Sequence, residues 1–134
     1  IGSRISVAPG MPINTGTETA NISIDATGVV TAAFGVASHG QGLETTLAQI
    51  ITDDLGCAME DIVVLHGDSS LVPMSSGTYA SRSAVLGGGA ATMASRTLKT
   101  KVLKMAAILM DVPVEDLNMH AGLITSRASN QSLR

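Results

Sequence analysis

Hydrophobic and polar residues alternate in the first clearly patterned stretch of the chain, residues 22–35. Residues 22–25 read apolar, polar, apolar, polar, which is typical of a half-buried β-strand. Ala26-Thr27-Gly28 carries a turn signal, and a β-rich run continues from Val29 to Gly35. We therefore predict a β-hairpin over residues 22–35.

Helical spacing appears in two later stretches. In the first, Gly56 stands where a glycine commonly ends a helix in a left-handed conformation, and the apolar face comprises Leu43, Leu47, Ile50, Ile51 and Leu55. A longer helix is predicted to open at Gly87-Gly88-Gly89 and to end before Pro113. Its expected buried stripe comprises Ala90, Met93, Ala94, Leu98, Val102, Ala106 and Leu109.

The remaining apolar runs are short and predict strands. Residues 62–65 form a β-branched run between the two helices, and residues 117–120 and 123–126 flank Ala121-Gly122 as a second hairpin. Segments 59–67 and 114–122 resemble each other, which indicates a helix–turn–strand joint used twice. The order β-β-α-β-α-β-β predicts an α+β fold, a two-layer sandwich in which two helices pack on one face of a mixed sheet.

Composition narrows the class of protein. A length of 134 residues fits one domain, and 45% hydrophobic with 14% charged residues excludes disorder. The net charge is −3 and no basic run occurs, which argues against a nucleic-acid partner. No stretch is long and apolar enough to span a bilayer. The chain begins with Ile1 in a strand-like run that does not resemble a signal peptide, and we expect it to be part of a longer protein.

Cys57 is the single cysteine of the chain. One thiol can form neither an internal disulfide nor an iron–sulfur or thiolate zinc site within this chain. We interpret Cys57 as a small buried residue and expect a reducing, cytoplasmic location.

Residues 67–83 lack any periodicity, and a loop of this length inside a compact domain is usually functional or disordered. The segment ends in Ser81-Arg82-Ser83, where two hydroxyls flank a guanidinium just before a glycine-rich helix start. Together these groups suit an anion, although the serines could equally cap the helix. The glycines at 87–89 form no phosphate-binding fingerprint and favour close packing over ligand contact.

A second candidate segment is Gly40-Gln41-Gly42, preceded by His39. Two glycines let a ligand approach the backbone, and the glutamine amide can serve the edge of a heterocycle. The alternative is an ordinary strand-to-helix turn with a solvated glutamine. His66 and His120 occupy equivalent positions of the repeat, where a structural role is expected, and no pair of histidines has metal-ligand spacing.

Three segments in order resemble the molybdopterin-binding large subunits of the xanthine dehydrogenase, aldehyde oxidase and aerobic carbon monoxide dehydrogenase family. They are residues 38–50 around the glutamine, residues 60–68, and residues 77–85, Gly-Thr-Tyr-Ala-Ser-Arg-Ser-Ala-Val. The resemblance implies one cofactor-binding domain over residues 1–134, a fragment of a larger subunit. It places Gln41 against the pterin, and it implies cofactor-binding roles for Gly40, Gln41, Gly42, Thr78, Ala80, Ser81, Arg82 and Ser83.

The same resemblance implies a molybdenum oxidoreductase that hydroxylates its substrate with oxygen from water. The metal is held by the dithiolene of the pterin, which in bacteria is often the cytosine dinucleotide form. Electrons leave through iron–sulfur clusters and FAD on other domains or subunits, which with the remainder of the large subunit are the implied partners. The family's catalytic glutamate directly follows a glycine, and no Gly-Glu pair occurs here. We therefore expect the isolated chain to be inactive and, with apolar surface uncovered, to self-associate.

Two other functions remain open from the residues alone. A binding module for a nucleotide or another phosphate compound would use the same serine–arginine loop without molybdenum. A purely structural or oligomerisation domain would use neither loop. The identity of the substrate is not encoded in this stretch.

Overall fold

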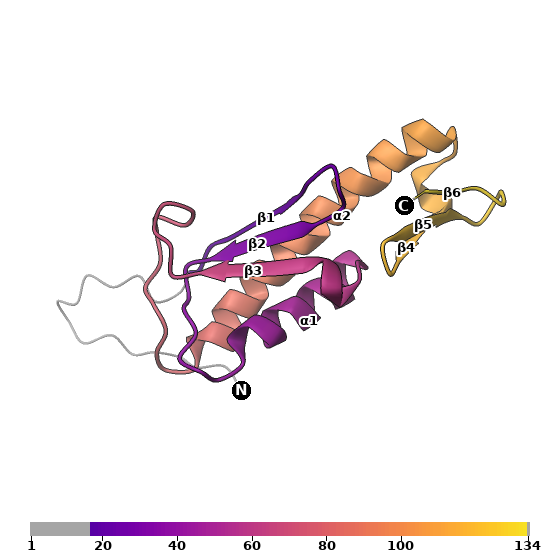
Figure 1. Cartoon of the computed structure of the whole chain (residues 1–134). Coiled ribbons are helices and arrows are strands. Elements are labelled where there is room, and N and C mark those ends of the chain that lie inside the picture. The colour runs from indigo at the N-terminus through magenta and orange to yellow at the C-terminus, as the bar shows by residue number, and fades with distance from the viewer. Residues whose placement is uncertain (1–16, 134) are drawn as a thin grey trace.

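The computed structural model describes residues 17–133, so residues 1–4, on which the expectation about the N-terminus rests, lie outside the described part. Two helices and two small sheets make up the fold (Figure 1). In chain order the elements are β1 (Ala20–Ile24), β2 (Val30–Phe34), α1 (Leu43–Leu55), β3 (Ile62–His66), α2 (Gly88–Met110), β4 (Leu117–His120), β5 (Leu123–Ser126) and β6 (Ser132–Leu133). Single 3-10 turns at Met59–Asp61 and Val114–Asp116 precede β3 and β4, and a π-helical turn at Ser83–Gly87 precedes α2.

The first sheet has the order β1-β2-β3 and is mixed. β1 pairs antiparallel with β2, from Ala20 opposite Phe34 to Ile24 opposite Val30. β2 pairs parallel with β3, because α1 forms the crossover between these two strands. The predicted α+β class, the first hairpin and the mixed sheet are confirmed.

The hydrophobic core lies between this sheet and both helices, which cover one of its faces (Figure 1). Val30, Ala32 and Phe34 point into it from β2 and are almost completely buried. The predicted face of α1 is confirmed, since Leu43, Leu47, Ile51 and Leu55 are buried and Ile50 packs at the margin. α1 ends at Gly56, whose φ of 88° is the expected left-handed cap.

The C-terminal hairpin differs from the prediction because it forms its own sheet, β4-β5-β6, instead of joining the first. The length of α2 explains this difference. Its 23 residues span about 34 Å, whereas a five-residue strand spans only about 17 Å. The distal half of α2 therefore extends beyond the first sheet, and the second sheet packs there through Leu117, Met119 and Ile124.

The buried stripe of α2 agrees with the predicted one only in part, because Ala106 is buried and Leu98 and Val102 pack against the core. Met93 and Leu109 are each 74% exposed, while Gly88, Ala91, Ser95, Ala106 and Met110 are buried. Small residues occupy the buried face because α1 packs closely against this helix. A Cβ on Gly88 would lie 3.1 Å from Cδ1 of Ile50. Gly87 likewise packs against Val36, which supports close packing as the role of the first two glycines in the run.

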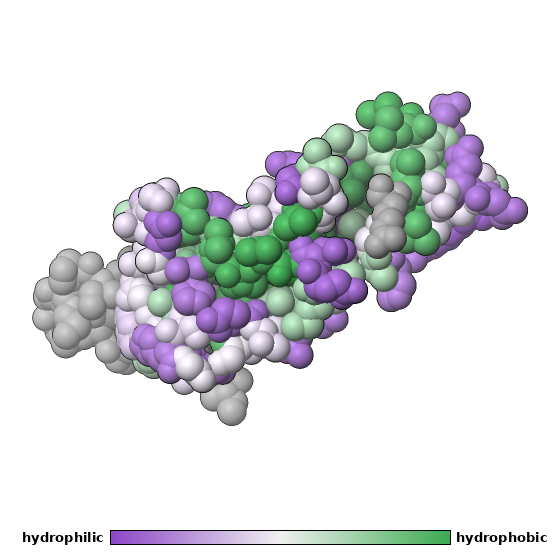
Figure 2. Space-filling model, viewed as in Figure 1, coloured by the Kyte–Doolittle hydropathy of each residue, from purple (hydrophilic) through white to green (hydrophobic). Residues whose placement is uncertain are grey.

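Two areas of the surface are apolar (Figure 2). One lies over the open face of the first sheet, where Val63 and Leu65 of β3 are exposed. The other lies at the far end of α2, where Met105, Ile108 and Leu109 are exposed. In the described part of the chain, neither helix is long and apolar enough to cross a membrane.

Candidate functional site

Two loops that are far apart in sequence meet at a hollow of about 360 Å³. One is the glutamine loop, residues 38–42, which connects β2 to α1, and the other is the serine–arginine loop, residues 77–83, which leads into α2. Among the residues expected to bind a cofactor, Gln41, Thr78, Ala80, Ser81 and Ser83 line the hollow, and His39 joins them. Gly40, Gly42 and Arg82 do not line it.

The glutamine loop takes its shape from its two glycines. Gly40 has a φ of 88° and Gly42 a φ of 71°, conformations that residues with a Cβ rarely adopt. No atom lies within 4 Å of a Cβ built on either residue, so conformation rather than crowding requires glycine here. Gly42 then starts α1, and its carbonyl accepts hydrogen bonds from the backbone N–H and the hydroxyl of Thr46.

The side chain of Gln41 is exposed and oriented by its own loop. Its Oε1 accepts a hydrogen bond of 2.5 Å from the backbone N–H of His39. An oxygen must occupy this position because the partner is a donor. The Oε1 atom is therefore engaged within the loop, while the NH₂ group of the amide carries two donors at the edge of the hollow.

The serine–arginine loop contains a tight turn over residues 79–82. The N–H of Arg82 donates to the carbonyl of Tyr79 at 3.1 Å, and the two central residues, Ala80 and Ser81, have φ values of 49° and 61°. Positive φ at both central positions is the mark of a type I′ turn, which normally takes glycine, asparagine or aspartate. Left-handed backbone at such residues costs about 1 kcal/mol or more each and tends to occur at functional sites.

A helix begins directly after this turn. The π-helical turn from Ser83 to Gly87 runs into α2, so backbone N–H groups without an intrahelical partner lie beside Ser83 at the edge of the hollow. The positive end of the helix dipole lies at the same place. Together with the hydroxyls of Ser81 and Ser83, these groups make this side of the hollow suited to a negatively charged group.

The guanidinium of Arg82 lies inside the protein and not in the hollow. Its side chain is 0% exposed and pairs with Glu18 at 2.6 Å, and it also donates to the carbonyls of Gly77 and Thr17. The anion contact expected of Arg82 thus stays a prediction. The chain places this side chain beneath the loop, and Glu18 is a partner that nothing in the sequence pattern had singled out.

A second group that sequence reasoning missed supports the glutamine loop. Glu44, in the first turn of α1, binds Nε2 of His66 at 2.8 Å through one carboxylate oxygen and the hydroxyl of Ser38 at 3.0 Å through the other. Hydrogen bonds from its own backbone N–H, from His66 and from Ser38 lower the pKa of the Glu44 carboxyl below its ordinary value of 4.5. An acidic residue in a first helical turn and a histidine at a strand end were visible in the sequence, but their contact depends on the parallel pairing of β2 and β3.

Two other titratable groups, Cys57 and Asp54, have contacts away from the hollow. Cys57 is buried, and burial raises the pKa of its thiol. Asp54 at the end of α1 binds Nε of Arg96 from α2 at 2.8 Å, and this cation offsets the unfavourable position of a carboxylate at a helix C-terminus. Within residues 17–133, no group of three or more histidine, cysteine, aspartate or glutamate side chains could hold a metal ion.

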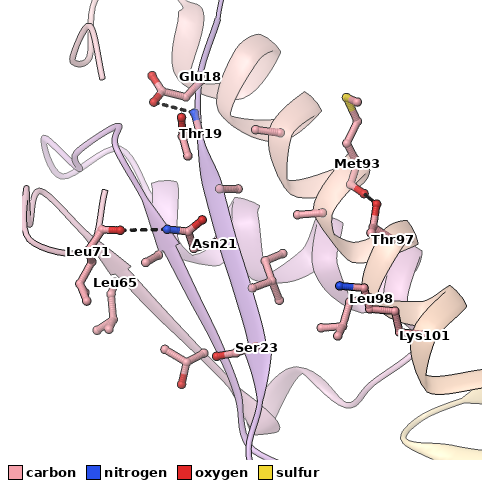
Figure 3. A pocket seen from close by; sticks show the side chains of 16 residues that line it. Glu18, Thr19, Asn21, Ser23, Leu65, Leu71, Met93, Thr97, Leu98 and Lys101 are labelled. Carbon is pink, nitrogen blue, oxygen red and sulfur yellow. Dashed lines mark hydrogen bonds between the residues drawn. The ribbon is translucent and has the colours of Figure 1, made fainter. Parts of the chain in front are cut away.

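A larger hollow of about 660 Å³ lies elsewhere, between the open face of the first sheet, strand β1 and the flank of α2 (Figure 3). Asn21 and Ser23 face it from β1, while Met93, Thr97 and Lys101 face it from α2. None of the residues expected to bind a cofactor lines it. Its one link to the serine–arginine loop is Glu18, at one end.

Comparisons with known proteins show which family the chain belongs to. The family model described as molybdopterin cofactor-binding domain matches residues 2–134. The chain is 36% identical over 116 residues to the gamma subunit of the 6-hydroxypseudooxynicotine dehydrogenase complex of Paenarthrobacter nicotinovorans, covering 87% of this chain and 15% of that subunit. It is 42% identical over 100 residues to the carbon monoxide dehydrogenase large chain of Afipia carboxidovorans, covering 75% of this chain and 12% of the relative.

The solved structure of quinoline 2-oxidoreductase from Pseudomonas putida 86 superposes with a TM-score of 0.75 at 38% identity, covering 82% of this chain and 14% of that one. The chain therefore belongs to the molybdopterin cofactor-binding domain family found in the large subunits of molybdenum hydroxylases. It spans only 12–15% of the length of the first relatives named.

Proposed function

We propose that residues 1–134 form a single domain of a molybdenum hydroxylase large subunit, and that the domain holds part of the molybdopterin cofactor between its two loops. The observation that carries the proposal is that Gln41, Ser81 and Ser83, expected from the sequence to bind the cofactor, line one hollow. The domain supplies binding groups and lacks the glutamate that acts on the substrate, so it serves the reaction without completing the active site.

The residues present fit the chemistry of this cofactor. Pterin rings carry carbonyl and ring-nitrogen acceptors, and Gln41 offers its NH₂ group because its oxygen is already engaged by His39. Phosphate groups need donors, and the start of α2 with Ser81 and Ser83 offers backbone N–H groups and hydroxyls. We assign the pterin to the glutamine loop and a phosphate to the serine–arginine loop.

The bound group would supply the metal and the redox chemistry of hydroxylation, while this chain would hold and orient it. Within the same proposal, the cofactor is the cytosine dinucleotide form, and FAD and iron–sulfur clusters reside on other domains or subunits of a cytoplasmic complex. Exposed apolar side chains such as Ile108 and Leu109 on α2 are candidates for contact with the rest of the large subunit, and in the isolated chain they would favour self-association.

Metal and pterin analysis of the full-length large subunit carrying this sequence tests the proposal. We expect molybdenum and pterin in the purified protein and less of both in Gln41→Ala, with an unchanged melting temperature because the exposed side chain adds little to the core. Gln49→Ala, which removes an exposed glutamine from α1, is the matched control. A protein that binds phosphate compounds but contains no molybdenum would contradict the proposal and favour a phosphate-binding module.

A further inference from the structure

The strained turn at Ala80 and Ser81 has a buried support directly beneath it. Arg82, the last residue of the turn, uses Nη1 to donate to both Glu18 and the carbonyl of Gly77, each at 2.6 Å. Its Nη2 donates to the carbonyl of Thr17 at 2.7 Å. The guanidinium therefore ties both ends of the loop, Gly77 and Arg82, to the segment that leads into β1.

Glu18 is held as firmly as its partner. One carboxylate oxygen accepts from the backbone N–H of Thr19 at 3.0 Å, and the other accepts from the hydroxyl of Ser75 at 3.1 Å and from Arg82 (Figure 3 shows the Thr19 contact). Both side chains of the pair are 0% exposed. Removing either partner would leave an uncompensated charge in the interior, which is strongly unfavourable.

Two further contacts restrict the pair. The guanidinium carbon of Arg82 lies 5.5 Å from the centre of the Tyr79 ring, so the first and last residues of the turn are joined by a cation–π contact. Gly35 packs against the carboxylate from the other side, since a Cβ there would lie 2.6 Å from Oε1 of Glu18 and would collide with Ser75. The absence of a side chain at Gly35, just after β2, therefore leaves room for the Glu18 carboxylate.

We propose that Arg82 and Glu18 are positioning residues that hold the left-handed backbone of Ala80 and Ser81 in the shape that receives the cofactor, and that Arg82 does not itself contact the cofactor. The proposal rests on the proposed function of the hollow. It explains how two residues with a Cβ stay at positive φ. The planar guanidinium of Arg82 donates to three acceptors at once, and these hydrogen bonds hold the turn in its strained conformation.

Conservative variants of the full-length large subunit distinguish positioning from direct contact. Glu18→Gln keeps the shape of the side chain but removes its charge, and Arg82→Lys keeps a charge but cannot reach all three acceptors. We expect both variants to fold, and to lose the cofactor about tenfold faster on dilution into cofactor-free buffer. Arg96→Lys, which alters an exposed arginine–carboxylate pair, is the matched control and should lose it at the wild-type rate.

Direct contact predicts a different pattern. A lysine still offers a positive charge to a phosphate, and Glu18 lies away from the hollow, so Glu18→Gln would then retain the cofactor normally. Wild-type retention by Glu18→Gln would therefore overturn the proposal. A double variant, Glu18→Leu with Arg82→Met, adds a check on folding: removing both charges should restore much of the melting temperature lost in Glu18→Leu alone, while cofactor loss stays fast.

Amide exchange in the cofactor-free protein separates this proposal from the proposed function. We expect residues 79–83 to exchange at least about tenfold faster in Glu18→Gln than in the wild type, because the turn loses its support. Unchanged exchange at these residues would overturn the positioning role whichever molecule the hollow binds. A wild-type protein without molybdopterin but with faster exchange in the variant would refute the cofactor assignment and leave the support of the turn established.

Discussion

The hydroxyl of Thr78 exchanges two hydrogen bonds with the backbone of Ala37, accepting from its N–H at 2.8 Å and donating to its carbonyl at 2.7 Å. These bonds join residues 41 positions apart and are partly buried. They connect the serine–arginine loop to the segment that leads into the glutamine loop. The side chain of Thr78 therefore links the two sides of the hollow directly.

Thr78→Val should weaken the link between the two loops. Valine keeps the shape of threonine but leaves the N–H and carbonyl of Ala37 without their partner, which costs about 1–3 kcal/mol. We expect a loss of this size in the free energy of unfolding, measured with denaturant, and lower cofactor content per folded subunit. Thr97→Val removes a hydroxyl that bonds only within α2 and should change stability by less than about 0.5 kcal/mol. Equal effects of the two substitutions would contradict the linking role of Thr78.

The hydrogen bond between Glu44 and His66 predicts a dependence of stability on pH. The pKa of Glu44 is lowered in the folded protein, so its ionised form adds stability above its unfolded pKa of about 4.5, and this contribution is lost as pH falls through the lower, folded value. The free energy of unfolding of Glu44→Gln should therefore lie below that of the wild type at pH 6, and the gap should narrow below pH 4.5. Glu60→Gln, an exposed carboxyl before β3, controls for the loss of a surface charge. A difference in the free energy of unfolding between the wild type and Glu44→Gln that grows as pH falls would contradict the stabilising role of ionised Glu44.

The isolated chain of 134 residues should fold and oxidise nothing. We expect it to fold because one hydrophobic core is continuous across both helices and both sheets. Activity is not expected because no glutamate directly follows a glycine and Cys57 alone cannot hold a redox centre. An assay with aldehydes or purines and an artificial electron acceptor measures this, with buffer as the blank. Turnover above the blank would contradict the role of a cofactor-binding part.

Much of the fold followed from periodicity, and the failures have physical causes. The stripe of α1 was correct because five large aliphatic residues mark one face. On α2, large and small apolar residues surround the helix, and the face that packs is the one whose small residues, Gly88, Ala91 and Ser95, let α1 come close. The local sequence pattern cannot show which face of α2 packs, because that depends on the shape of α1. The separate second sheet likewise follows from the length of α2 relative to the strands.

The sequence indicated two loops that lie at the hollow, but not the orientation of every side chain in them. Gln41, Ser81 and Ser83 line the hollow as their loops suggested. Arg82 was expected to face an anion because arginine beside hydroxyls commonly does, but its partner, Glu18, lies 64 positions earlier in the chain. A contact of that separation leaves no periodic signal, so only the folded arrangement shows that the guanidinium points inward.

The central claim is that the glutamine loop and the serine–arginine loop together hold the cofactor. Amide exchange of the full-length large subunit, compared with and without bound molybdopterin, tests it most directly. The account predicts that cofactor binding slows exchange at residues 38–46 and 77–84, while residues 117–133 of the second sheet exchange equally in both forms. Equal exchange of both loops in the two forms would contradict the claim.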